Sequence, residues 1–214
     1  MKEDTYQSKK WASEFGKMYT DRNPHTIEEM DEIYKKQYGI TRTELNLMFL
    51  NDFDRGIKIL EIGSNVGTQL QGLQKIGFTN LYGIELQQYA VELSKQYTKN
   101  VNLIQGSVLD IPFKDNFFDL VFTSGVLIHI SPDDIEVAMK EIYRCTKKYI
   151  WGFEYYADTY TEISYRGENN LLWKADFAKI FVEKLPDLEL IKVKQIKYLS
   201  NDNIDFMFLL QKKI

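Results

Sequence analysis

The chain has 214 residues, of which 44% are hydrophobic and 27% charged, and its formal net charge is −4. This length fits one domain with a sizeable core better than two small domains. The acidic balance disfavours a broad attraction to nucleic acid. No window reaches the roughly 20 apolar residues that cross a bilayer, and the polar start lacks the apolar core of a signal peptide. A single cysteine, Cys145, excludes an internal disulfide. We therefore expect a cytoplasmic protein, with neither nucleic acid nor membrane as partner, whose one thiol is buried and unreactive.

The first quarter of the chain is predicted to be helical. Trp11 and Phe15 recur at helical spacing, and Thr41 begins a capping box before an apolar run. We therefore divide the chain into an N-terminal helical cap, residues 1–52, and a core, residues 53–214, within one structural domain.

Short apolar strands and helices then alternate along the chain. Such alternation is typical of βαβ units, which form a parallel sheet through right-handed crossovers. One of the helices is expected to carry Pro132 in its first turn, where proline is favoured. The expected strands cover residues 57–62, 81–85, 101–105, 118–123 and 149–155, and the expected helices cover residues 66–76, 88–97 and 132–145.

The remainder of the chain begins with an irregular segment. Residues 156–173 are rich in Tyr, Asn and Gly, and a helix is expected to begin at Lys174 and to end at Leu185. Two closing strands are expected at residues 188–199 and 204–211. The connection between them is short and rich in turn-forming residues, so they should run antiparallel to each other.

The strongest candidate for a functional motif is the segment KILEIGSNVG at residues 58–67. An apolar strand ends around Glu61, Gly63 makes the turn and Gly67 begins the next helix. Glu85 ends the following strand, 22 residues after Gly63. A glycine loop between strand and helix, with a carboxylate about 20 residues later, is the general nucleotide-binding arrangement. The carboxylate is expected to accept hydrogen bonds from ribose hydroxyls.

This loop favours S-adenosylmethionine (SAM) over a dinucleotide. A dinucleotide fingerprint needs glycine in the middle of the loop, where the pyrophosphate lies against the backbone, and this chain has Asn65 there. SAM has no pyrophosphate, and its carboxylate suits the free N–H groups at a helix start. The predicted cofactor-binding residues are Tyr19, Arg22, Glu61, Gly63, Ser64, Asn65, Gly67, Glu85, Leu86, Gly106, Ser107, Val108, Ser124, Gly125 and Val126.

Several longer motifs follow one another in the order EIGSNVG, GIEL and IQGSVLDIPFKDNFFDLVFTSGVLIHISPDD. In these motifs the chain resembles the class I SAM-dependent methyltransferases. This family implies an α/β, Rossmann-like fold with a mostly parallel seven-stranded sheet and an antiparallel last strand. It also implies SAM as the methyl donor and S-adenosylhomocysteine (SAH) as the product. The chain departs from the common family pattern at Asn65 and at Ser107, where Gly and Asp are usual.

A narrower resemblance is carried by WASEFGKMYTDRN, GVLIHISPDD, EIYRCTKKYI, FEYY, YRG and LLWKADFA. Over about residues 11–182 the chain is similar to the methylases associated with pseudaminic acid biosynthesis. This clade implies an amino sugar or a nucleotide sugar as the methyl acceptor.

Side chains near the expected methyl group are candidates for handling the acceptor. Glu154, Tyr155 and Tyr156 lie at the end of the fifth strand, at the cofactor edge, and a carboxylate with phenols suits an amine or a polyol. His129 suits the base that O-methylation needs, or a hydrogen bond that holds a loop. We predict Glu154, Tyr156 and His129 as catalytic residues.

The irregular segment is a candidate cover for the substrate. Tyr165 and Arg166 suit contact with a phosphate or carboxylate, which Arg binds bidentately, whereas an ordinary surface ion pair is the alternative. Lys174 is a weaker candidate because it is expected to begin a helix. The predicted substrate-binding residues are Tyr155, Tyr165, Arg166 and Lys174.

Three functions are compatible with these features. A methyltransferase that modifies N or O of a small molecule is favoured. A protein methyltransferase, or a SAM-binding protein without turnover, is an alternative. An NAD-dependent oxidoreductase is disfavoured by Asn65 and by the lack of a second domain. Two histidines and one cysteine, far apart, exclude a zinc site of the usual spacing, and no other metal is expected. A monomer and a homodimer fit the sequence equally well.

Overall fold

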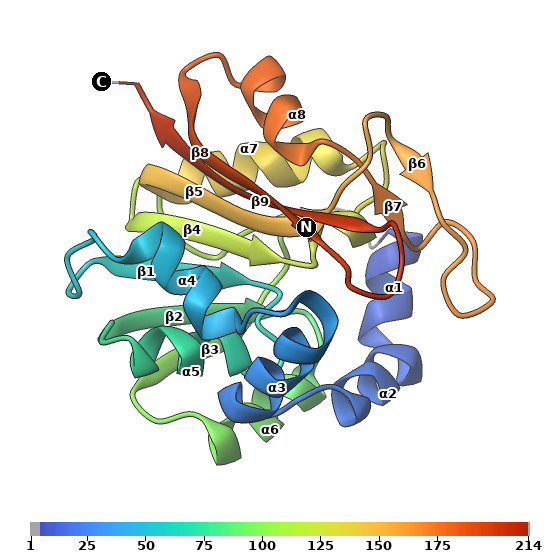
Figure 1. Cartoon of the computed structure of the whole chain (residues 1–214), viewed down its shortest axis with the longest axis horizontal. Helices are drawn as coiled ribbons and strands as arrows, with labels where there is room; N and C mark the ends of the chain where they lie inside the picture. Colours follow the sequence, from blue (N-terminus) through green and yellow to red (C-terminus); the bar gives the residue numbers. More distant parts are fainter. Residues whose placement is uncertain (1–4, 214) are drawn as a thin grey trace.

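The computed structural model describes residues 5–213, which fold around a seven-stranded sheet flanked by helices (Figure 1). The strands of this sheet are β1 (Lys58–Ile62), β2 (Asn80–Glu85), β3 (Val101–Gln105), β4 (Phe118–Ser124), β5 (Thr146–Tyr155), β8 (Leu188–Lys197) and β9 (Ile204–Lys212). They lie in the order β3-β2-β1-β4-β5-β9-β8. The first five pair in parallel, whereas β9 runs antiparallel to both of its neighbours. The predicted Rossmann-like sheet with an antiparallel last strand is confirmed.

The N-terminal segment forms four helices, and the last of them belongs to the core. These helices are α1 (Tyr6–Ala12), α2 (Glu14–Arg22), α3 (Ile27–Tyr38) and α4 (Arg42–Leu50). The predicted capping box is present, because the Glu44 N–H donates to Thr41 Oγ1 and the Glu44 carboxylate accepts from the Thr41 N–H. Leu45 and Leu50 are fully buried against the sheet. The last helix of the proposed cap, residues 1–52, therefore packs on the strands of the proposed core.

Helices cover both faces of the sheet (Figure 1). The helices after the first strand are α5 (Thr68–Lys75), α6 (Gln88–Tyr97), the 3₁₀ turn η1 (Leu127–His129), α7 (Ile135–Cys145) and α8 (Phe177–Lys184). One core cluster joins α7 and α8 to the sheet, and a second joins α4 and α5 to it. No helix among residues 5–213 is long and apolar enough to cross a membrane. The expectation of no signal peptide also concerns Met1–Asp4, which lie outside the described residues.

Several predicted boundaries are wrong, and capping explains the clearest case. The helix expected at Lys174 begins at Phe177, because the Asp176 side chain accepts the N–H of Lys179 and caps it. Lys174 lies instead in a short strand, β7 (Trp173–Lys174), which pairs with β6 (Thr161–Glu162). The segment expected to be irregular thus contains a two-stranded sheet.

Two more boundaries shift within the parallel part of the fold. Pro132 is not in the first turn of a helix, because a turn precedes α7, which begins only at Ile135. Strand β5 begins at Thr146, directly after α7 and before the expected start at residue 149. Local patterns gave the type of each element here but not its first residue.

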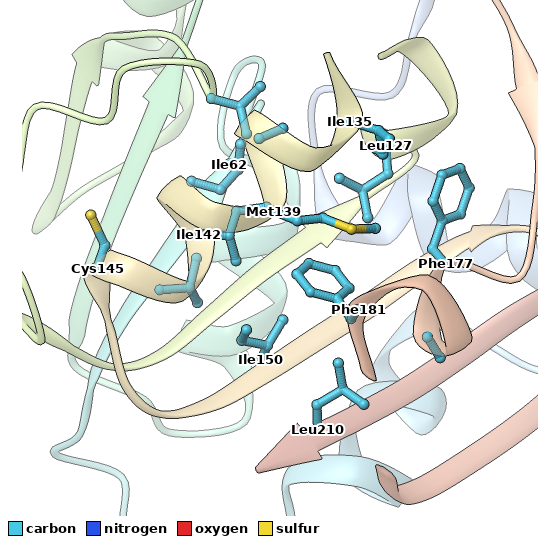
Figure 2. Packing of buried hydrophobic residues seen from close by; sticks show 14 of the residues in the cluster. Ile62, Leu127, Ile135, Met139, Ile142, Cys145, Ile150, Phe177, Phe181 and Leu210 are labelled. Atoms are coloured by element: carbon cyan, nitrogen blue, oxygen red, sulfur yellow. The ribbon is translucent and has the colours of Figure 1, made fainter. Parts of the chain in front are cut away.

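The larger core cluster fills the space between α7, α8 and the sheet (Figure 2). Met139, at the centre of α7, is fully buried, and Figure 2 shows its side chain pointing toward Phe177 and Phe181 of α8. Cys145 ends the same helix and is also fully buried, as predicted. Burial raises the pKa of its thiol to about 11, so at neutral pH it stays protonated and unreactive.

Replacing Met139→Ala should destabilise the protein by about 2–5 kcal/mol, because it leaves a cavity between α7 and α8. Urea unfolding followed by circular dichroism measures this loss. Met18→Ala is the matched control, since Met18 is 57% exposed and its truncation should change the unfolding free energy by less than about 0.5 kcal/mol. Equal effects of the two substitutions would contradict the packing described for α7.

Candidate functional site

A cavity of about 450 Å³ lies at the edge where the parallel strands end. Loops after β1, β2, β3 and β4 line one side of it, and α1, α2 and α3 line the other. Strand order reverses between β1 and β4, and ligands of open α/β sheets bind at such a switch point. The predicted residues that line the cavity are Tyr19, Arg22, Glu61, Gly63, Ser64, Asn65, Glu85, Leu86, Gly106, Ser107, Val108, Ser124, Gly125, Val126, His129 and Tyr155.

The glycine loop keeps its shape through three residues in the left-handed region. Gly63 has φ +64°, and a Cβ there would lie 2.6 Å from the Cγ2 of Val126. Asn65 has φ +48°, which asparagine tolerates better than most residues. Gly67, with φ +82°, precedes α5 but does not line the cavity. Its predicted cofactor contact is thus replaced by a conformational role, since a Cβ there would meet the side chain of Thr98 at 2.7 Å.

Glu85 is fixed at the end of β2 by two backbone groups. Its Oε2 accepts the N–H of Asn65 at 2.9 Å, and its Oε1 accepts the N–H of Gln87 at 2.8 Å. Burial raises the pKa of this carboxyl, and the backbone donors oppose that rise. Each oxygen retains accepting capacity beyond these bonds, so the carboxylate can still bind hydroxyl donors in the cavity.

Glu61 is more deeply buried and less satisfied. It is 2% exposed, and its Oε2 has no hydrogen-bond partner among the described residues. Burial raises its pKa well above the usual value, while the charge of Arg42 opposes this rise. An unpartnered buried oxygen that borders a cavity is suited to accept from a bound ligand.

No pattern in the sequence marked Arg42 as a site residue. Its side chain carries a buried positive charge near the cavity. Its side chain is fully buried, and its Nε donates to Asn46 Oδ1 at 2.9 Å. Its Nη1 donates to the hydroxyl of Tyr34 at 3.2 Å, and the guanidinium lies 4.5 Å from the ring centre of Phe153. A basic residue in the first turn of a helix gives no sign in sequence that it is buried.

Glu154 and Tyr156, predicted as catalytic, do not line the cavity. Glu154 is 1% exposed, and its two oxygens accept the N–H groups of Val126 and Ile128 at 3.2 and 3.4 Å. It therefore supports the loop after β4 from beneath. The hydroxyl of Tyr156 donates to Asp158 outside the cavity. Neither side chain is placed to touch a ligand in this cavity.

His129 lines the cavity in a fixed tautomer. Its Nδ1 lies 2.7 Å from the carbonyl oxygen of Leu171, so Nδ1 carries the proton and donates it. Burial lowers the pKa of this imidazole to about 4, so the ring is neutral at neutral pH. Trp11 packs on the ring with centroids 4.5 Å apart. Nε2 is therefore a neutral acceptor at the cavity, and a weak base.

The three other predicted substrate residues lie outside the cavity lining. Tyr165 packs against His129, with ring centroids 5.5 Å apart. Arg166 is exposed at φ +54°, with its guanidinium 5.8 Å from the Tyr165 ring. Lys174 donates to Asn203 Oδ1 at 2.8 Å. None of these three side chains contacts the space that a ligand would occupy here.

Segments distant in sequence hold α1 over the cavity. Lys10 and Glu168 form an ion pair at 2.6 Å, and Tyr6 also donates to Glu168. Farther inside, Trp11 packs edge-to-face on Phe15. The helical spacing of these aromatic residues predicted a packed helix, but only the fold shows that Trp11 faces the cavity.

Comparisons with known proteins agree with this geometry. Residues 60–149 match a family model described as a methyltransferase domain. The chain is 28% identical to sterol 24-C-methyltransferase of Aspergillus fumigatus over 115 residues, which are 51% of this chain and 30% of that protein. It is 35% identical to demethylmenaquinone methyltransferase of Staphylococcus aureus over 98 residues, which are 44% and 40% of the two chains. The chain thus spans less than half the length of these relatives.

Solved structures extend the likeness to nearly the whole fold. One is a chain of the complex between the Haloferax volcanii Trm112 methyltransferase activator and a methyltransferase, with a TM-score of 0.73, 14% identity and coverage of 95% of this chain and 98% of that one. Another is the Burkholderia thailandensis 1,6-didemethyltoxoflavin-N1-methyltransferase with bound SAH, with a TM-score of 0.64, 13% identity and coverage of 80% and 76%. The chain has the class I methyltransferase fold.

Ionisation of Glu154 should make the stability of the protein depend on pH. Burial raises the pKa of Glu154 to about 7 in the folded state, above its ordinary value of 4.5. Between these values the unfolded chain releases this proton and the folded chain keeps it, so stability falls as pH rises through the window. Glu154→Gln should remove this contribution, on the order of 1–3 kcal/mol.

Urea unfolding of wild type and variant at pH 5, 6, 7 and 8 measures the difference. We expect the unfolding free energy of the wild type minus that of Glu154→Gln to decline up to about pH 7 and then to level off. Parallel stability profiles across this range would contradict the assignment of a neutral, buried Glu154.

Proposed function

We propose that the chain binds SAM in the 450 Å³ cavity and transfers its methyl group to nitrogen or oxygen of a small molecule, releasing SAH. The observation that carries this proposal is the pair of carboxylates at the ends of β1 and β2. Glu85 is held by two backbone N–H groups, and Glu61 keeps an unpartnered oxygen. Neighbours of the same fold described as SAM-dependent methyltransferases support the choice of cofactor.

The residues present fit the parts of SAM. Glu85 suits the ribose hydroxyls, and the unpartnered oxygen of Glu61 suits the ammonium group. The backbone around Gly63 admits close approach, since a Cβ would not fit there. Ser107 and Val108 border the same cavity where the adenine is expected. A dinucleotide fits less well, because Asn65 carries a side chain where pyrophosphate needs bare backbone.

Bound SAM would supply a methyl group that its sulfonium already activates. The protein's task is then alignment of the acceptor with that methyl, which can contribute roughly 7–11 kcal/mol to lowering the barrier. The aromatic rings of Trp11 and Tyr19 exclude water from one side of the cavity. The free Nε2 of His129 is placed to accept a hydrogen bond from an acceptor group.

The proposed acceptor is small, and an amino sugar or nucleotide sugar is the narrower proposal. Its support is the motif resemblance to the methylases associated with pseudaminic acid biosynthesis, together with the polar side chains of this cavity. The sterol and menaquinone methyltransferases match only part of this chain. A protein acceptor is the second candidate, and a cytoplasmic location remains a proposal that rests on the single buried thiol.

SAH should stabilise the wild-type protein by about 2.7 kcal/mol at a concentration of one hundred times its Kd. Glu85→Ala should weaken SAH binding about tenfold or more, because hydrogen bonds to a charged group contribute roughly 1.5–3 kcal/mol. Calorimetric titration measures the affinity for SAH of the wild type and of Glu85→Ala. Glu92→Ala is the control, since Glu92 lies on α6 and pairs only with its helix neighbours Gln88 and Lys95. Equal loss in both variants would remove Glu85 from the proposed site.

Incubation with methyl-labelled SAM and extract from the source cells should place label in the small-molecule fraction. Mass spectrometry of the labelled species then tests the sugar assignment directly. Label confined to protein would replace the small-molecule acceptor by a protein. The absence of SAH binding in the titration would contradict the cofactor itself.

A further inference from the structure

A buried carboxylate lies behind one end of the cavity. Asp205, on β9, is 1% exposed and accepts hydrogen bonds from the hydroxyls of Tyr38 and Tyr198, the latter at 3.1 Å from Oδ2. Tyr155 is its partner in the register of β5 and β9. Phenols are neutral donors, so they satisfy the lone pairs of the carboxylate without neutralising its charge.

No cation pairs with Asp205 among residues 5–213. Lys174 and Arg42 act on Asp205 only through longer-range attraction, which lowers its pKa. Arg42 donates to Asn46 and Tyr34, and Lys174 donates to Asn203. Burial raises the pKa of Asp205 to about 6, so the carboxylate is mostly ionised at neutral pH. Buried charges in proteins are normally paired in direct contact, whereas this one is attracted to its cations only at longer range.

The cavity surface in front of Asp205 is aromatic. Tyr34, Tyr38, Phe153 and Tyr155 all line this end of the cavity. The ring of Tyr34 lies 5.1 Å from that of Tyr38 and 5.7 Å from that of Phe153. Faces of such rings attract cations, and they do so more strongly where water is excluded. An aromatic surface with a negative charge behind it is suited to a small ammonium group.

We propose that the Asp205 cluster, made of Tyr34, Tyr38, Tyr155, Tyr198 and Asp205, is the acceptor subsite and binds an ammonium group, so that the methyl acceptor is an amine. This inference rests on the proposed methyl transfer from SAM in the same cavity. It assigns the acceptor atom as nitrogen.

Methylation of the bound amine needs one proton acceptor, and Asp205 is the proposed one. The bound ammonium first loses a proton through the hydroxyl of Tyr38 to the carboxylate of Asp205. The neutral nitrogen then forms a bond to the methyl carbon as the bond between that carbon and sulfur breaks. The positive charge moves from sulfur to the methylated nitrogen, and Asp205 afterwards releases its proton to water.

The test compares two sugars that differ in charge. D-Glucosamine carries an ammonium group, and N-acetyl-D-glucosamine carries a neutral amide at the same carbon. Each is titrated into SAH-saturated protein, with ligand-observed NMR to give Kd. We expect the wild type to bind glucosamine about tenfold more tightly, which corresponds to about 1.4 kcal/mol.

Asp205→Asn should reduce this preference to less than about threefold, since it removes the charge and keeps the shape. Asp202→Asn is the matched control, because Asp202 is exposed in the turn before β9 and its loss should leave the preference intact. Tyr38→Phe provides a second variant in case Asp205→Asn does not fold, and it should lower glucosamine affinity without lowering SAH affinity.

The two proposals fail in different ways. Absence of SAH binding by the wild type would contradict the proposed function. SAH binding with equal affinity for the two sugars, including no binding of either, would overturn the ammonium subsite alone. A preference that persists in Asp205→Asn would also overturn it.

Discussion

Arg42 carries a positive charge into the core, and the arrangement of the site depends on how that charge and the neighbouring carboxylates are balanced. Its guanidinium is fully buried between aromatic rings, and its charge opposes the rise in the pKa of Glu61. A buried charge is costly unless the fold compensates it, and Nη2 of Arg42 has no hydrogen-bond partner among the described residues. The capping box that begins at Thr41 and the burial of Leu45 fix α4 against the sheet, and so fix Arg42 beneath the cavity.

This balance makes the N-terminal segment part of the site. Helix α3 supplies Tyr34 and Tyr38 to the cavity wall, while α4 supplies the buried charge beneath it. Helices α1 and α2 close the opposite side, and the ion pair of Lys10 with Glu168 ties α1 to the segment before β7. Ligand binding should therefore depend on contacts between parts of the chain that are more than 150 residues apart.

The cofactor half of this site was predictable, because its determinants are local. A strand that ends in a glycine turn, and a carboxylate at the end of the next strand, place Gly63 and Glu85 together in any such sheet. The proposed acceptor half was not predictable, since Asp205 comes to lie behind the cavity wall only through the long-range pairing of β9 with β5. Glu154 was placed wrongly relative to the cavity for a related reason. Alternation along β5 sends it under the loop after β4, while Tyr155 faces the ligand space.

The buried carboxylates differ in how completely the protein satisfies them, and this difference indicates what each one does. Glu154 accepts two backbone N–H groups and borders no ligand space, so it is satisfied within the fold. Glu85 is equally well held but faces the cavity, which suits a fixed acceptor for a ligand. Glu61 lacks a partner for one oxygen, and Asp205 has phenol donors but no cation in direct contact among residues 5–213. Glu61 lines the cavity and Asp205 lies behind its aromatic wall, so both groups suit a hydrogen-bond donor on a bound ligand. An ammonium group on the cofactor and an amine on the acceptor would supply these donors, and would leave the activated methyl group between them.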